Sequence, residues 1–322
     1  MTDLGKMSRR DATTFVISIT TFDDQERLDE EALRGHFRRL AGSGIGVYVG
    51  GGGSGEGFTL TPDEARRVLE IASEELKGKV PVRAMGVEPR TARQMIDFSG
   101  VVADAGLEAM QIYSLDMGHG NVPRPNELER YLVDILSVVR IPVILSTHMS
   151  VGYQLPIDLI SGLVSRYDNI IGVNCTNPDL TYLLRLVDKL DDRIEVHVGG
   201  PMQALTALAF GASGYLSSEG NLAPRLCVSV VDRYRSGDVS GSHDAYTKVM
   251  RIFTMAVQHG GIRFTKAALT LLGLPGGIPR RPQLPVTDPS ALGDISAVLD
   301  ELGIRDIEEL ADAGHPHEGQ AS

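Results

Sequence analysis

The 322-residue sequence contains no tryptophan and only two cysteines, Cys175 and Cys227. Two cysteines cannot form a disulfide framework, so we expect a protein of a reducing cytoplasm. No apolar run is long enough to cross a bilayer, and the N-terminal "MTDLGKMSRRDATTF" lacks the apolar core of a secretory signal. No cluster of lysine and arginine stands out, and the formal net charge is -11. This balance argues against nucleic acid and membranes as partners.

Hydrophobic residues make up 42% of the chain, enough for a large core. Short apolar runs alternate with amphipathic segments, which predicts strands alternating with helices. The expected strands are 14–21, 46–49, 80–86, 108–113, 141–147, 169–174, 194–199 and 213–218. Expected helices include 29–43, 62–76, 91–105, 126–138 and 178–190.

Eight such units predict a parallel sheet closed into a (β/α)8 barrel over residues 1–222. A doubly wound sheet is the competing fold, but the first strand leads into "FDDQERLDEE" and not into a glycine-rich dinucleotide turn. The strand signal stops near residue 222, and helical patterns follow. We therefore expect a C-terminal helical region over 223–322.

A glycine-rich loop, "VGGGGSGEGFTLTPDE" at 49–64, follows the second expected strand. Active sites of such barrels lie at the C-terminal ends of the strands. Consecutive glycines allow backbone N–H groups to approach an anion closely, so the loop is a candidate anion cradle. The simpler interpretation is a tight turn before a helix.

From this loop onward the sequence resembles the dihydrodipicolinate synthase / N-acetylneuraminate lyase superfamily. "GGSGEGFTLTPDEARRVLE" (52–70) resembles the family's GTTGE-x-x-T-L-x-x-x-E signature. Residues 15–49, 79–112 and 264–286, together with "DNIIGVNCTNPDL" in the sixth unit, carry the resemblance over most of the chain. It implies a barrel with three C-terminal helices, usually in a homotetramer, and cleavage, condensation or dehydration of 2-oxo acids. In the family, the part of the loop matching Gly53, Ser54, Gly55 and Glu56 holds the substrate carboxylate.

The sixth strand departs from the family at its central residue. The family reads G-I-K-E/D there, and its lysine forms a Schiff base with the 2-oxo acid. This chain reads Gly172-Val173-Asn174-Cys175, and an amide nitrogen cannot form an iminium. Six lysines occur elsewhere, at 6, 77, 79, 189, 248 and 266, and none is expected to rescue the site.

Two further departures fall at strands four and five. The family's strand-five tyrosine, which shuttles protons, is replaced by Ser146, and its carboxylate-gripping arginine is absent from "ILSTHMSVGY" (144–153). After strand four the family's aromatic motif becomes the longer "IYSLDMGHGNVPRP" (112–125), where Tyr113 stands in a comparable place.

Four interpretations remain open. The chain is an inactive paralogue that binds a small carboxylate or regulates a partner. Alternatively it is an enzyme with altered chemistry, in which Asn174 donates a hydrogen bond to a carbonyl or enolate oxygen and His148 acts as acid or base. A divalent metal is a third possibility, with candidate ligands Glu88, Asp116, His119, His148 and Glu219. A nucleophilic Cys175 is the fourth, although strand alternation turns it away from the barrel axis.

We predict an enzyme of the lyase type that works without a Schiff base, a cofactor or a metal. The predicted catalytic residues are Asn174, His148, Ser146 and Tyr113, and the predicted substrate-binding residues are Gly53, Ser54, Gly55 and Glu56. The expected partner is a small carboxylate or carbonyl substrate. By resemblance we also expect a cytoplasmic homo-oligomer, a tetramer or a dimer.

Overall fold

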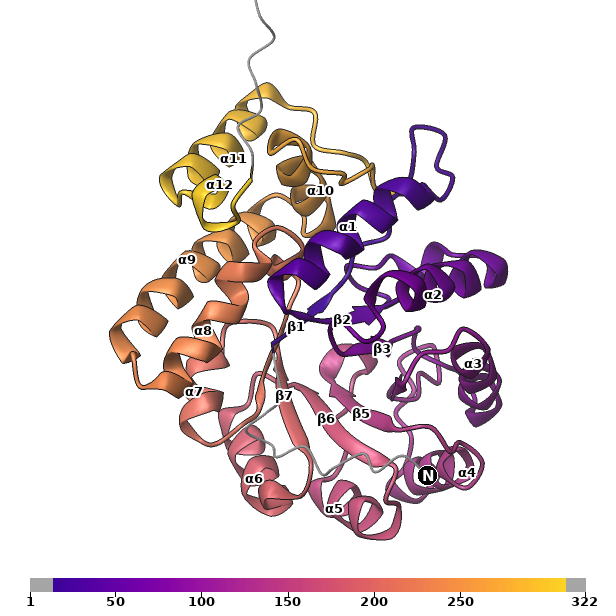
Figure 1. Ribbon diagram of the computed structural model, residues 1–322. Coiled ribbons are helices and arrows are strands. Elements are labelled where there is room, and N and C mark those ends of the chain that lie inside the picture. The colour runs from indigo at the N-terminus through magenta and orange to yellow at the C-terminus, as the bar shows by residue number, and fades with distance from the viewer. Residues whose placement is uncertain (1–13, 311–322) are drawn as a thin grey trace, which may run out of the picture.

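The computed structural model describes residues 14–310, in which eight parallel strands close into one barrel in sequence order. The strands are β1 (Phe15–Ile17), β2 (Gly46–Val49), β3 (Val82–Ala84), β4 (Ala109–Ile112), β5 (Val143–His148), β6 (Ile170–Thr176), β7 (Glu195–Gly199) and β8 (Gly214–Ser217). The (β/α)8 prediction is therefore confirmed, and Figure 1 looks into the barrel. The N-terminal segment, in which we expect no secretory signal, lies outside the described residues. Lys6 is part of this segment.

A helix follows each strand and covers the outside of the barrel. These helices are α1 (Glu30–Ser43), α2 (Pro62–Leu76), α3 (Ala92–Asp104), α4 (Pro125–Leu136), α5 (Ile157–Arg166), α6 (Leu180–Leu190), α7 (Ala204–Ala209) and α8 (Pro224–Ser236). Four more follow: α9 (Val239–Gln258), α10 (Ile262–Leu271), α11 (Pro289–Glu301) and α12 (Ile304–Ile307). Since α8 completes the eighth unit, the barrel repeat runs to Ser236, one helix past the expected boundary at residue 222. No helix between residues 14 and 310 has the length and apolar character needed to cross a membrane.

Local sequence explains where α2 begins, directly after the glycine-rich loop. Thr61 caps the helix by accepting from the backbone N–H of Glu64, while the Glu64 side chain accepts from the N–H of Thr61. Pro62 occupies the first turn, where its missing N–H leaves no bond unmade. This reciprocal cap fixes the point at which the loop ends.

Strand alternation divides the buried residues into two clusters. Outward side chains such as Val47, Val173 and Val198 pack against the helices in the large core. Inward side chains, including Phe15 and Tyr48, form a small separate cluster inside the barrel. The inner cluster belongs to the layers of side chains that fill barrels of this kind.

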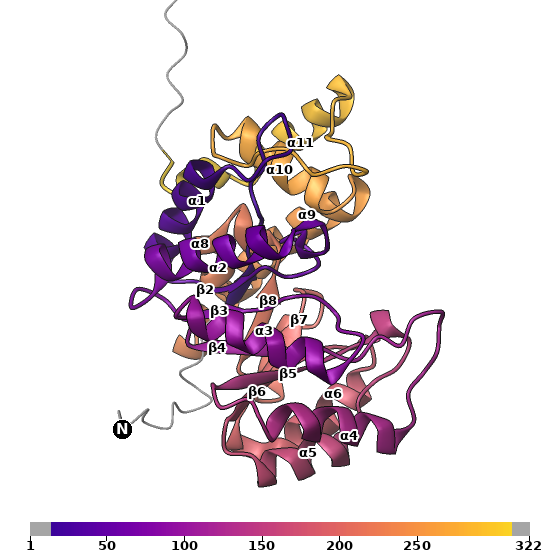
Figure 2. The ribbon, with the colours of Figure 1, turned by 90° about the vertical axis from the view of Figure 1, so that its right-hand side faces the viewer.

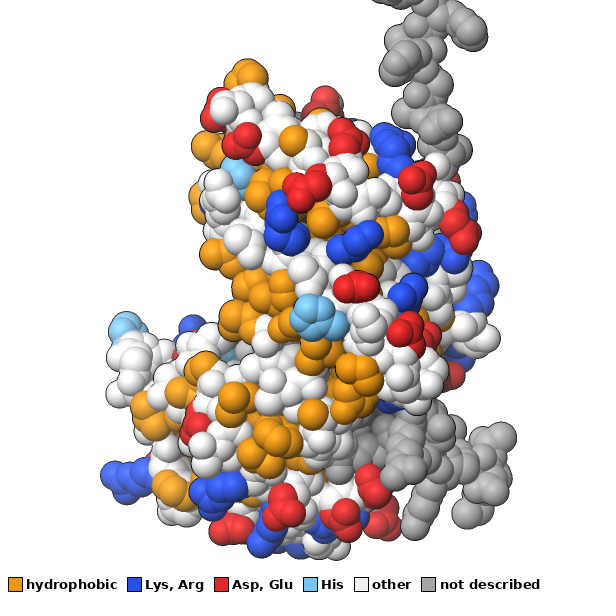
Figure 3. Space-filling model, turned by 90° about the vertical axis from the view of Figure 1, so that its left-hand side faces the viewer, with side chains coloured by type: hydrophobic (Ala, Val, Ile, Leu, Met, Phe, Trp, Pro, Cys, Tyr) orange, Lys and Arg blue, Asp and Glu red, His pale blue; other side chains and the backbone are white. Residues whose placement is uncertain are grey.

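Two surface features stand out from the barrel. The loop between β4 and α4 is long and projects from one side in Figure 2. Hydrophobic side chains gather on the face shown in Figure 3, the left-hand side of Figure 1, where α6, α7 and α9 lie. Exposed apolar residues on or beside these helices are Leu180, Leu184, Met202, Phe210, Val239 and Val257.

The appended helices hold the β2 loop by a buried ion pair. Glu56, in a left-handed conformation with φ of 50°, places its carboxylate 2.5 Å from the amine of Lys266 on α10. Both side chains are buried, at 0% and 1% exposure. The second Glu56 oxygen accepts from the backbone N–H of Arg280, and Lys266 donates to the carbonyl of Ile278 at 2.7 Å. Because both charges have partners, the loop is fixed to the C-terminal region.

Replacing Lys266 by methionine leaves the Glu56 carboxylate buried without its countercharge. We expect the free energy of unfolding to fall by about 3–5 kcal/mol, as when one partner of a buried pair is removed. Urea unfolding followed by circular dichroism measures the change. The control is Lys189→Met, which breaks an exposed pair with Asp158 and should change stability by less than about 0.5 kcal/mol. Equal losses in the two variants would contradict the anchoring role of Lys266.

Candidate active site

The predicted catalytic residues lie together at the C-terminal ends of β4, β5 and β6. Ser146 and Asn174 are register partners on adjacent strands. His148 ends β5, and Tyr113 directly follows β4 with its ring edge-on to the His148 imidazole, the ring centroids 5.5 Å apart. All four residues are buried, between 3% and 7% exposed as whole residues. The sequence-based grouping of these four residues therefore corresponds to one cluster in space.

Asn174 is held by a neighbour that the sequence analysis did not identify. Its side-chain N–H donates to Oε1 of Gln111 on β4 at 2.5 Å. The Asn174 Oδ1 is buried and has no hydrogen-bond partner among residues 14–310. One amide hydrogen is thus donated to Gln111 and the other to Tyr48, which leaves Oδ1 without a partner among these residues.

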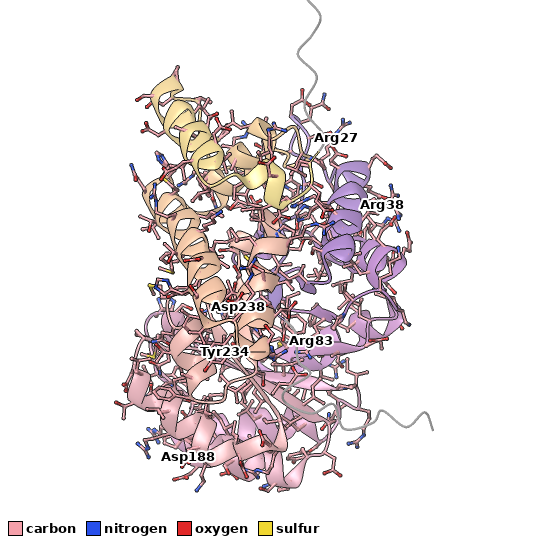
Figure 4. The ribbon with its side chains drawn as sticks, turned by 60° about the vertical axis from the view of Figure 1, so that its left-hand side comes forward. Arg27, Arg38, Arg83, Asp188, Tyr234 and Asp238 are labelled. Carbon is pink, nitrogen blue, oxygen red and sulfur yellow. The ribbon has the colours of Figure 1, made fainter. Side chains whose placement is uncertain are left out.

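A charged layer lies inside the barrel next to Asn174. Arg83 on β3 pairs with Glu195 on β7 at 2.8 Å and donates to the Tyr48 hydroxyl at 3.2 Å. Its guanidinium also stacks on Phe15, 4.2 Å from the ring centre. Burial raises the pKa of Tyr48, while Arg83 and a hydrogen bond from Asn174 oppose that rise. In Figure 4, Arg83 lies within the barrel, whereas Arg27 and Arg38 lie on the outer surface.

The glycine-rich loop presents free backbone donors. No hydrogen bond among the described residues is donated by the N–H groups of Gly53, Ser54 or Gly55. Glycine is required at position 55, because a Cβ there would lie 2.7 Å from the carbonyl oxygen of Gly51. Three consecutive backbone donors are therefore available to an anion.

Tyr113 lies between the glycine-rich loop and the cluster of predicted catalytic residues. Burial raises the pKa of its hydroxyl, and the nearby charge of Glu88 raises it further. Hydrogen bonds from the N–H of Gly52 and from Gln111 oppose the rise. The Tyr113 hydroxyl therefore lies between the loop and the Gln111–Asn174 pair.

His148 is a neutral imidazole at neutral pH. Burial lowers its pKa below the usual 6.5, and the carboxylate of Glu88 opposes this shift. Its Nδ1 is hydrogen-bonded to the hydroxyl of Ser150. Its Nε2 lies 3.6 Å from Oε1 of Glu88 and has no hydrogen-bond partner among residues 14–310. The imidazole can accept a proton.

Glu56 lies elsewhere than expected for a substrate-binding residue. Its fully buried carboxylate faces Lys266 and the N–H of Arg280, which leaves no oxygen open to a ligand. The physical reason is its left-handed backbone, which turns the side chain away from the loop's free amides and toward α10. Its place in the structure is that of a loop anchor.

Three of the other candidates, Cys175, Asp116 and Glu219, have surroundings outside the cluster. Cys175 points outward into the core between sheet and helices, so the alternation argument holds. Asp116 pairs with Arg90 at 2.9 Å, and Glu219 is buried against the hydroxyls of Ser217 and Ser218. Within residues 14–310, no group of three or more histidine, cysteine or acidic residues could hold a metal ion.

The described lysines all lie away from Asn174. Lys77 donates to the carbonyl of Gly106, and Lys79 precedes β3 at the opposite end of the barrel. Lys189 lies late in α6, and Lys248 donates to the carbonyl of Leu302. Lys266 is committed to Glu56 and Ile278, and burial lowers its pKa. No lysine amine within residues 14–310 forms a hydrogen bond with Asn174.

The architecture and the cluster define a (β/α)8 protein with a glycine-rich loop and a group of polar side chains at the C-terminal ends of its strands. The sequence profile of the dihydrodipicolinate synthetase family matches residues 11–299. The chain belongs to this family. It is 31% identical over 266 residues to 4-hydroxy-tetrahydrodipicolinate synthase of Methanopyrus kandleri, covering 82% of this chain and 87% of the relative.

Further relatives agree with this assignment. The enzyme of the same name from Methanococcus maripaludis strain S2 is 25% identical over 281 residues, covering 87% of this chain and 95% of the relative. A crystal structure of dihydrodipicolinate synthase superposes with a TM-score of 0.82 at 24% identity, covering 91% of this chain and 99% of that one. YagE from E. coli K12, solved in complex with pyruvate, also gives 0.82, at 22% identity and with the same coverage. At these identities the two structures support the fold.

Burial raises the pKa of the Cys175 thiol to about 12 and raises that of Cys227 as well. Because the thiolate is the reactive form, we expect neither cysteine to react in the folded protein at neutral pH. Titration with a thiol-reactive dye should show two reactive groups in denaturant and none in buffer. Rapid labelling of Cys175 in buffer would contradict its outward, buried placement.

Proposed function

We propose that this protein is a lyase-type enzyme that enolises a 2-oxo acid or related carbonyl compound without a lysine Schiff base. The single observation that carries this proposal is the amide of Asn174 at the inward position of β6. An amide cannot form the iminium that would otherwise withdraw electrons from the substrate. The reaction would be an aldol cleavage or condensation, or a dehydration, as the family and the names of its relatives suggest.

The substrate carboxylate would bind to the N–H groups of Gly53, Ser54 and Gly55. The support is their lack of any partner among the described residues and their position beside Tyr113, which accepts from Gly52. Backbone donors fixed before the ligand arrives stabilise negative charge without reorganisation. The ion pair between Glu56 and Lys266 fixes the loop and so supports this preorganisation.

The carbonyl oxygen would lie against the polar cluster. In place of its hydrogen bond to Tyr48, Asn174 could donate its second amide hydrogen to an enolate oxygen, and Ser146 is its neighbour across the sheet. His148 is neutral at neutral pH and is suited to proton transfer, and Tyr113 lies against its ring. No metal or cofactor enters this proposal.

We also propose, on the basis of the family, that the protein is a homo-oligomer. The apolar side chains on the face formed by α6, α7 and α9 would be buried at such an interface. Sedimentation velocity at micromolar protein concentration tests this point, and a monomer would contradict it.

Proton exchange tests the function without knowledge of the second substrate. In D2O, we expect the protein to speed the exchange of the C3 protons of pyruvate or 2-oxobutanoate, as followed by proton NMR. His148→Asn should slow the catalysed exchange by about 10²–10⁴-fold, the usual contribution of an acid–base group. The matched control is His243→Asn on α9, which should leave the rate unchanged. Binding of both acids without exchange would contradict the enzyme and favour the carboxylate-binding paralogue.

A further inference from the structure

Glu88, on the loop after β3, bridges the anion cradle and His148. A Cβ built on Gly52 would lie 3.4 Å from its Oε2, so this oxygen lies beside the cradle. Its Oε1 lies 3.6 Å from Nε2 of His148. One carboxylate therefore faces both the expected position of the substrate and the buried imidazole.

The two partners differ in exposure. The Glu88 side chain is 33% exposed, whereas that of His148 is 9% exposed. A ligand entering the mouth would meet the carboxylate first and the imidazole behind it. The exposed part of Glu88 also allows its proton to exchange with solvent.

The surrounding groups leave this pair without a competing countercharge. Arg90 and Asp116, the charged residues on the adjoining loops, pair with each other at 2.9 Å. Tyr113 contributes a phenol against the His148 ring. Ser150 holds the other imidazole nitrogen, which fixes the direction of Nε2. Among residues 14–310, Glu88 is the group whose charge raises the pKa of His148.

We propose that Glu88 is the base that takes the proton from the bound substrate, with His148, the acid–base group of the proposed function, behind it. This inference deepens the proposed function and rests on it. The carbon–hydrogen bond next to the carbonyl breaks, its electron pair becomes the enolate, and the proton bonds to Oε2 of Glu88. The neutral carboxyl group exchanges this proton for a deuteron from D2O and returns the deuteron to the enolate carbon, which completes the exchange.

The substitution Glu88→Gln keeps the size of the side chain and removes its basicity. We expect pyruvate exchange in D2O to fall by about 10²–10⁴-fold. Glu88→Asp keeps a carboxylate and should restore part of the rate. Glu129→Gln, on the exposed face of α4, is the matched control and should behave as wild type.

A titration of His148 tests the pair without any activity. In wild-type protein the carboxylate stabilises the imidazolium, so Glu88→Gln should lower the pH midpoint of the His148 resonance in NMR spectra. The resonance is assigned by its loss in His148→Asn. An unchanged midpoint would overturn the pair, whatever the exchange assay shows. A lowered midpoint with undiminished exchange in Glu88→Gln would overturn the assignment of Glu88 as base. Wild-type protein that shows the pair but no exchange would instead contradict the proposed function.

Discussion

The buried pair between Glu56 and Lys266 fixes the geometry on which the mouth of the barrel depends. A loop with this many glycines has high conformational freedom in the unfolded chain and is ordered at a corresponding entropic cost. The ion pair, the N–H of Arg280 and the carbonyl of Ile278 together hold the loop in one conformation. The free amides of Gly53 to Gly55 are then in place before any ligand arrives, which is the condition for electrostatic stabilisation to be effective.

The barrel interior imposes the second constraint. Every second residue of a strand faces the barrel interior, and in β6 one of these inward residues is Asn174. Its neighbours are the Gln111 amide and the layer in which Arg83 pairs with Glu195. Charged side chains inside a barrel need partners, since an unpaired buried charge is strongly unfavourable. Asn174 thus lies in a hydrogen-bonded network of amides, next to the ion pair of Arg83 and Glu195.

Much of the fold could be predicted from the sequence, because apolar periodicity reports strands and helices directly. The run 46–49 was expected to be a strand and is β2, and 62–76 was expected to be a helix and is α2. The grouping of Ser146, His148 and Asn174 followed from their places at strand ends. These predictions needed local pattern and the rule that barrel sites lie at the C-terminal ends.

Contacts between distant segments could not be read in the same way. Lys266 lies 210 positions after Glu56, and nothing in either local pattern indicates their pairing. Gln111, Arg83 and Glu195 lie inside expected strands and carried no prediction. In "IEVHVG" and "VPVRAMG", however, Glu195, His197 and Arg83 alternate with apolar residues, a pattern that indicates a polar interior. The alternation was visible, but the direction of each side chain required the closed barrel.

The central claim is that catalysis proceeds without a covalent imine. The most direct measurement is the intact mass of the protein after incubation with pyruvate and borohydride, compared with a lysine-bearing member of the family treated in parallel. The account predicts an unchanged mass for this protein and a reduced pyruvyl adduct on the comparison enzyme. An adduct on any lysine of this chain, located by peptide mapping, would contradict it.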